Sequence, residues 1–205
     1  MAQHGVEVLD GFYVLEGVDG AGTTTQADKL AAHLATRGKV WRTCEPSDAA
    51  VGSLIRRALH DTPPLSDRSL ALLYAADRQE HVFGPDGIRE RCLRGEPVVC
   101  DRYLFSSLAY QGSALSFDFV YELNAHFPLP EALIFLDTPL AIAARRMQTR
   151  NALDHLEQPN VQERVIHAYH EVLGRSWPDT MRVIRIDGTQ PPDTVFAAII
   201  EALAR

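Results

Sequence analysis

The alternation of short apolar runs with longer amphipathic segments is the feature that most constrains the fold of this chain. The apolar runs predict strands, because they are short and bounded by turn residues. These runs cover residues 12–16, 40–44, 97–101, 132–137 and 181–187. Since the segments between them have helical spacing, the alternation predicts an α/β fold, an open five-stranded parallel sheet flanked by helices. The runs ending at Asp101 and Asp137 are nearly all apolar, as expected of strands buried on both faces.

Two of the helical segments have clear limits in the sequence. Apolar residues recur at helical spacing over residues 24–37, and Gly38 ends that segment. A longer helical segment runs from about Asp67 to Arg94, and the turn at Pro85–Gly87 is expected to kink or split it.

Length and charge restrict the class of protein. A chain of 205 residues is long enough for one compact domain, so residues 1–205 are expected to form a single domain. The net charge of −7 disfavours nonspecific DNA binding, and no apolar run approaches the roughly 20 residues of a membrane span. No signal peptide is evident, so the cytoplasm is the expected location, and we expect neither a nucleic acid nor a membrane partner. The cysteines form no CxxC pair, which is typical of reduced thiols.

A glycine-rich loop follows the first predicted strand and precedes the first predicted helix. Its residues are Gly17, Val18, Asp19, Gly20, Ala21, Gly22, Thr23, Thr24 and Thr25. The spacing matches the P-loop pattern G-x-x-x-x-G-K-[ST], except that Thr23 stands at the lysine position. In such a loop backbone N–H groups surround phosphate oxygens, and the helix N-terminus adds partial positive charge. The loop predicts an ATP site in which Thr24 reaches Mg²⁺; a plain glycine-rich turn is the alternative.

The threonine at the lysine position has a consequence for catalysis. Positioning and electrostatics supply most of the catalysis of phosphoryl transfer, and Thr23 carries no charge. Either another cation takes over or turnover is slow. We hypothesise that Arg146 or Arg150 takes over; a Thr23→Lys enzyme many times faster than wild type would argue against this.

Three further segments carry a recognisable pattern. Residues 72–81 read Leu-Leu-Tyr-Ala-Ala-Asp-Arg-Gln-Glu-His, and residues 43–46 read Thr-Cys-Glu-Pro. Residues 98–112 contain Asp-Arg-Tyr followed by Ser-Leu-Ala-Tyr-Gln-Gly. With these segments the chain resembles the thymidylate kinase family from its first strand to its last helix. The family usually has Phe at the position of Tyr74 and Arg at the position of Cys44.

The resemblance implies a fold, an activity and a set of partners. The implied fold is a P-loop NTPase-type sheet like that of nucleoside monophosphate kinases, with a lid at about residues 146–158. The implied activity is phosphorylation of dTMP to dTDP for dTTP biosynthesis, with ATP as donor and Mg²⁺ as cofactor, in a homodimer. Residues 145–157 resemble the lid, although His155 stands where the family has Arg. Bacterial members with a glycine at position 20 usually rely on lid arginines.

The resemblance also assigns roles to individual residues. Tyr74 and Arg78, one helical turn apart, would stack on thymine and donate to it. Arg102 and Arg56 would bind the acceptor 5′-phosphate, and Asp19 would accept from the 3′-hydroxyl. The full substrate-binding set is Asp19, Glu45, Arg56, Tyr74, Arg78, Arg102, Ser107, Tyr110 and Gln111; Ser107 and Gln111 face the base edge, and Tyr110 crowds the sugar 2′ position. The catalytic set is Asp19, Arg102, Arg146 and Arg150, and Thr24 with Asp101 would hold hydrated Mg²⁺.

Two other functions remain open at this stage. One is a kinase for another acceptor, such as dUMP or a modified pyrimidine nucleotide. The other is a catalytically weak or silent nucleotide-binding paralogue, which Thr23 and His155 suggest. The acceptor residues favour an active enzyme, because a silent protein has no physical need for Tyr74 and Arg78 together with Arg102.

Overall fold

The computed structural model describes residues 6–60, 64–147 and 156–205. Within these residues the strands form one parallel sheet in the order β2-β3-β1-β4-β5. Their bounds are Val8–Glu16 for β1, Trp41–Cys44 for β2, Val98–Asp101 for β3, Leu129–Asp137 for β4 and Arg182–Asp187 for β5. The predicted α/β class and the open five-stranded parallel sheet are confirmed.

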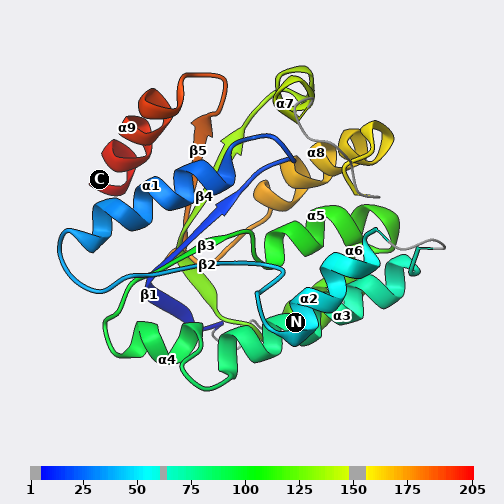
Figure 1. Cartoon of the computed structure of the whole chain (residues 1–205), viewed down its shortest axis with the longest axis horizontal. Helices are drawn as coiled ribbons and strands as arrows, with labels where there is room; N and C mark the ends of the chain where they lie inside the picture. Colours follow the sequence, from blue (N-terminus) through cyan, green and yellow to red (C-terminus); the bar gives the residue numbers. More distant parts are fainter. Residues whose placement is uncertain (1–5, 61–63, 148–155) are drawn as a thin grey trace.

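Helices cover both faces of this sheet (Figure 1). On one face α1 (Thr23–Ala35) packs beside α9 (Pro192–Leu203). The helices of the other face are α4 (Ile88–Leu93), α5 (Leu104–Ala114) and α8 (Pro159–Leu173). Two further helices, α3 (Asp67–Phe83) and α6 (Phe117–Asn124), pack against α5. Helix α2 (Ala50–Ala58) packs against α3, and α7 (Leu140–Met147) lies beside α8. These helices bury the apolar side chains of the sheet on both of its faces.

The central strands are as buried as their composition predicts. All residues of β3 are buried, and Ala132 to Leu136 of β4 are completely buried. Because β1, β3 and β4 are parallel, their carboxyl ends meet at one edge of the sheet. Ligands of open parallel sheets bind beyond this edge, so the side chains that follow these strands define the candidate site.

Two strand and helix limits are informative. The predicted helical segment from Asp67 to Arg94 splits at the expected turn, because α3 ends at Phe83 and α4 begins at Ile88. β1, in contrast, begins four residues before the predicted Phe12. Gly11 has a φ of 73°, and the pairing of β1 with β4 shifts register between Leu9 and Tyr13. This β-bulge interrupts the alternation of side chains and hides the start of the strand from sequence analysis.

Other expectations concern the thiols and the membrane. Cys44, Cys92 and Cys100 are free thiols, as predicted; Cys92 and Cys100 are buried, and Cys44 is half-buried. Across residues 6–60, 64–147 and 156–205, no helix combines the length and apolarity that a bilayer span needs.

Candidate active site

The glycine-rich loop runs from the end of β1 to α1, whose first residue is Thr23. Gly20 and Gly22 adopt φ values of 84° and 100°, in the left-handed region that favours glycine. A Cβ atom on Gly20 would overlap the carbonyl oxygen of Ala143 in α7, so a side chain at this position has no room. Gly22 caps α1 without a side-chain hydrogen bond. The structure therefore places the predicted ATP-binding residues 17–25 at a helix N-terminus suited to anions.

Thr24 and Asp101 come together at the edge of the sheet. The Thr24 hydroxyl donates to Oδ2 of Asp101 over 2.6 Å. The other carboxylate oxygen, Oδ1, is buried and has no hydrogen-bond partner among the described residues. Oxygen ligands of this kind suit Mg²⁺, which is held by one or two carboxylates and keeps several waters. The two residues predicted as a metal pair thus fit a magnesium site.

Arg102 and Asp19 form an ion pair between the end of β3 and the loop. Nη2 of Arg102 lies 2.6 Å from Oδ1 of Asp19, and Nη1 donates to the Gly17 carbonyl over 2.9 Å. Oδ2 of Asp19 accepts from the Tyr110 hydroxyl and from Nε2 of Gln162, each over 2.7 Å. The structure therefore brings together three residues that were predicted to bind the acceptor.

A cavity of about 130 Å³ lies next to this ion pair. Most of the predicted substrate-binding residues line it, namely Asp19, Glu45, Tyr74, Arg78, Arg102, Ser107, Tyr110 and Gln111. Tyr74 and Arg78 share one face of α3, as their spacing predicts. We refer to this cavity of about 130 Å³ below as the acceptor cavity.

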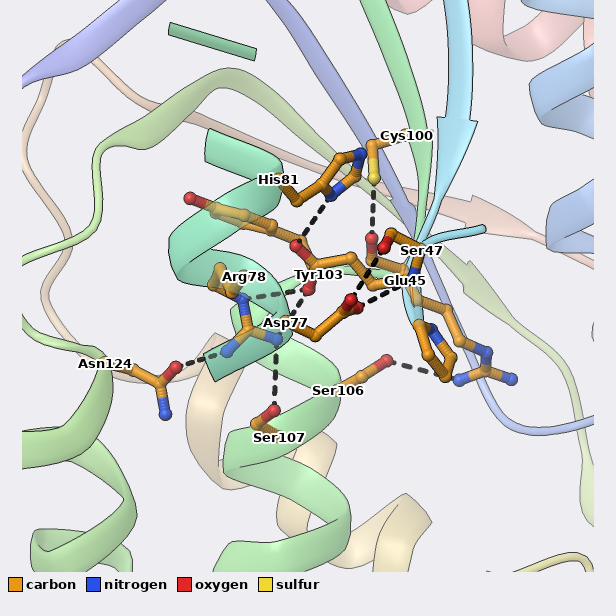
Figure 2. Close-up of polar contacts among 12 residues, drawn as sticks. Glu45, Ser47, Asp77, Arg78, His81, Cys100, Tyr103, Ser106, Ser107 and Asn124 are labelled. Carbon is orange, nitrogen blue, oxygen red and sulfur yellow. Dashed lines mark hydrogen bonds and ion pairs between the residues drawn. The ribbon is translucent and has the colours of Figure 1, made fainter. Parts of the chain in front are cut away.

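Arg78 is the most buried charged residue of the acceptor cavity, with 1% of its surface exposed. Figure 2 shows its guanidinium pointing toward Glu45, Ser107 and Asn124. Nη2 lies 2.6 Å from Oε2 of Glu45 and 3.1 Å from the Ser107 hydroxyl, and Nη1 donates to Oδ1 of Asn124. His81 supports Glu45 from behind, with Nδ1 3.2 Å from Oε1. Three buried polar side chains therefore fix the orientation of Arg78, and His81 orients one of them.

Arg56 and Arg146 lie outside the acceptor cavity. Both line a second cavity of about 560 Å³ over the glycine-rich loop, which we call the loop cavity. Arg56 donates to the carbonyls of Ser47 and Pro46 over 2.5 and 2.8 Å. Arg146 donates to the Ala21 and Gly188 carbonyls over 3.2 and 2.9 Å. Arg150 lies outside the described residues, as do the predicted lid positions 148–155.

The acceptor cavity and the loop cavity adjoin. Asp19, Glu45, Pro46 and Arg102 belong to the walls of both. A ligand in one cavity therefore meets a ligand in the other at the Asp19–Arg102 ion pair.

Sequence analysis missed four buried polar residues of this region. Glu16, His81, Asn124 and Gln162 are each at most 7% exposed and are bonded to predicted site residues or their neighbours. Glu16 ends an apolar run as Asp101 does, and His81 is the last residue of the recognisable segment 72–81, whereas Asn124 and Gln162 carry no comparable signal.

The fold and the site define a class. The strand order, the glycine-rich loop between β1 and α1 and the carboxylate–arginine pair after β3 are those of P-loop nucleoside monophosphate kinases. A family model described as "Thymidylate kinase" matches residues 15–199, and the chain belongs to the thymidylate kinase family.

Relatives agree with this assignment over nearly the whole chain. A Treponema pallidum protein named "Putative thymidylate kinase" is 39% identical over 201 residues, which cover 97% of each chain. A Pyrococcus horikoshii protein named "Probable thymidylate kinase" is 39% identical over 84% of this chain and 86% of its own. An Aeropyrum pernix protein is also 39% identical, over 86% of this chain and 85% of its own. Family membership implies nucleotide binding and ATP as the phosphoryl donor.

Proposed function

We propose that this chain transfers the γ-phosphoryl group of ATP to dTMP, forming dTDP and ADP and supplying dTTP biosynthesis. The observation that carries the proposal is the shared wall of the two cavities at Asp19 and Arg102. A donor on the loop and an acceptor in the cavity beside it meet there, which is the juxtaposition that phosphoryl transfer needs.

On the acceptor side, we assign the pyrimidine base of dTMP to the buried end of the acceptor cavity. Tyr74 supplies an aromatic plane, and Arg78 is held where it donates to a carbonyl oxygen of a pyrimidine. Ser107 and Gln111, both buried, face the base edge from α5. Tyr110 and Asp19 then lie beside the sugar, and Arg102 beside the 5′-phosphate. Arg56 stands on the loop side of this phosphate, in the wall of the loop cavity.

On the donor side, backbone N–H groups of the loop and the first turn of α1 hold the triphosphate. Thr24 and Asp101 would hold Mg²⁺, whose charge would offset part of the negative charge of the phosphates. The acceptor phosphate is already anionic, so the reaction requires no general base. Arg102 neutralises the charge that collects between the two phosphates when its guanidinium moves from Asp19 to the acceptor.

Thr23 stands at the position of the family's P-loop lysine, and the proposal assigns the missing charge to Arg146 and Arg150. Arg146 already lines the loop cavity, where its guanidinium is bonded to the Ala21 and Gly188 carbonyls. Phosphate oxygens bind a guanidinium more strongly than carbonyl oxygens do, so a bound triphosphate would compete with these two carbonyls for Arg146.

The test is ADP release by the purified protein with Mg-ATP and dTMP, dUMP, dCMP or no acceptor. Turnover selective for dTMP is the expected result. Faster turnover with dUMP would assign the second acceptor class. Binding of dTMP without turnover would instead establish a silent paralogue. A single domain over residues 1–205, a lid at about 146–158, a homodimer and a cytoplasmic location stay predictions.

A further inference from the structure

Glu16 is a buried carboxylate with no role in the reaction described so far. It is the last residue of β1, is 0% exposed and directly precedes the glycine-rich loop. Its Oε1 accepts from the backbone N–H groups of Tyr103 and Ser106 over 2.8 and 3.1 Å. Its Oε2 accepts from the hydroxyls of Ser106 and Tyr169 over 2.6 and 2.7 Å. Four donors from two other helical segments thus converge on one side chain.

The two backbone bonds make Glu16 the N-terminal cap of α5. Tyr103 precedes the first residue of that helix and supplies no side-chain cap of its own, because its hydroxyl donates to the Pro128 carbonyl. The first N–H groups of a helix lack partners within the helix and are costly to bury unpaired. A carboxylate from β1 accepts from the N–H of Tyr103 and from that of Ser106, which it shares with the Tyr103 carbonyl at 3.0 Å. The carboxylate also lies favourably beside the positive end of the helix dipole.

The two hydroxyl bonds connect Glu16 to Arg102. Nη1 of Arg102 lies 3.3 Å from the Ser106 oxygen and 3.4 Å from the Tyr169 oxygen. An ionised carboxylate only accepts, so both hydroxyl protons point to Glu16 and leave oxygen lone pairs facing the guanidinium. Glu16 thereby orients the Ser106 and Tyr169 hydroxyls so that both can accept hydrogen bonds from Arg102.

Arg102 depends on such support because its backbone is unusual. Its φ of 69° lies in the left-handed region, which is uncommon and unfavourable for a residue other than glycine. Its N–H donates to the Leu15 carbonyl, one residue before Glu16. Backbone and guanidinium of Arg102 are therefore both held by the end of β1.

We propose that Glu16 is a positioning residue that orients Arg102 toward the acceptor phosphate and, through Tyr169, ties α8 to the acceptor site. The inference rests on the proposed function, because it takes Arg102 as the residue that binds the acceptor. Burial raises the pKa of Glu16 to about 7, against the opposing effects of Arg102 and of the hydrogen bonds from Ser106, Tyr169 and Tyr103. The carboxylate is thus ionised, and accepts all four bonds, above neutral pH.

Glu16→Gln tests the inference with little change of shape. A glutamine has one accepting oxygen, so two of the four donors lose their partner and meet an N–H₂ group instead. Glu131→Gln is the matched control, because Glu131 of β4 also accepts from a backbone N–H, that of Gly11, and from a tyrosine hydroxyl, that of Tyr13. Its partners lie at the bulge of β1, at the other end of the sheet from the site.

The readout is the KM for dTMP against the KM for ATP. We expect Glu16→Gln to raise the KM for dTMP about tenfold or more, the effect of one lost charge-assisted hydrogen bond. The KM for ATP should stay within about twofold, and Glu131→Gln should change both by no more than that. An equal rise of both KM values with Glu16→Gln would overturn the inference, because it would show a general effect on the loop.

Tyr169→Phe provides a second route in case Glu16→Gln folds poorly. It removes one hydroxyl and leaves the other three bonds of Glu16 intact. We expect a rise of about threefold in the KM for dTMP, and no further rise when it is combined with Glu16→Gln, because the hydroxyl acts through the carboxylate. Additive effects of the two substitutions, or no effect of either, would overturn the inference while leaving the kinase intact. A wild-type protein that neither binds nor phosphorylates dTMP would overturn the proposed function itself, and the inference with it.

Discussion

The acceptor cavity and the loop cavity share Asp19 and Arg102 but are built in opposite ways. In the acceptor cavity, Arg78 is 1% exposed and is fixed by buried side chains. In the loop cavity, Arg146 is exposed and donates to the Ala21 and Gly188 carbonyls. Arg56 has a side chain that is 40% exposed, and it donates to two backbone carbonyls and to the exposed carboxylate of Asp48. Electrostatic interactions are stronger and more costly to disrupt where water is excluded. The groups proposed to recognise the acceptor therefore lie in a buried interior, whereas the arginines proposed to serve the donor are exposed enough to change partners.

The largest effect on stability should come from a substitution in the buried acceptor cavity. Arg78→Met leaves the Glu45 carboxylate, which is 5% exposed, without its guanidinium partner. Breaking a buried ion pair in this way costs about 3–5 kcal/mol, so we expect the free energy of unfolding in urea to fall by that amount. Arg89→Met is the control, since Arg89 pairs with Glu7 on the surface, and its urea midpoint should match wild type. Equal midpoints for the two variants would contradict the difference drawn between the cavities.

The next effect concerns the wall that both cavities share. Arg102→Lys keeps the charge but loses the two guanidinium N–H groups that bond the Gly17 carbonyl and the Asp19 carboxylate. We expect kcat/KM for dTMP to fall about 10²–10³-fold, as when one preorganised donor at a transition state is lost. Arg182→Lys controls for the loss of a guanidinium that bonds two acceptors, because Arg182 donates to two carbonyls at the C-terminal end of α9, away from the site. A comparable loss with Arg182→Lys would show that the substitution acts through stability.

Glu16 gives a prediction for the junction between the two regions. Its pKa in the folded protein, about 7, lies above its ordinary value of 4.5, because burial disfavours the charge. Between these two pH values the folded state binds more protons than the unfolded state, so this contribution to stability is present below pH 4.5 and is lost as the pH rises through 7. The loss amounts to about 3 kcal/mol and should be absent from Glu16→Gln. Urea unfolding of both proteins from pH 4.5 to 8 measures it, and parallel curves would contradict it.

The smallest effect is expected on the donor side. If Arg146 and Arg150 supply the charge, Thr23→Lys should change kcat less than tenfold, which corresponds to about 1.4 kcal/mol. Thr36→Lys, just beyond the last residue of the same helix, controls for adding a positive charge to α1. A Thr23→Lys enzyme about a hundredfold faster would show that the loop lacks a charge that nothing else provides.

Sequence analysis predicted most of the fold because the central strands are short, apolar and bounded by turn residues. It failed at the start of β1, where Asp10 and Gly11 interrupt the pattern at a bulge. The predicted site residues after β1 and β3 lie together at one edge of the sheet, because their place in the chain indicates their place in the sheet. Asn124 and Gln162 could not be found in this way, because a single polar residue on an amphipathic helix looks the same whether it faces water or a buried carboxylate.

The close approach of Gly20 to α7 restricts how this loop can change in evolution. A side chain at position 20 would have to adopt a φ near 84° and displace the Ala143 carbonyl, so an arginine cannot enter there by a single substitution without moving α7. A cation that reaches the loop cavity without such a movement must come from another position, as Arg146 of α7 does. The packing of α7 against Gly20, rather than the chemistry of the reaction, therefore limits which positions of the chain can supply a cation to the loop.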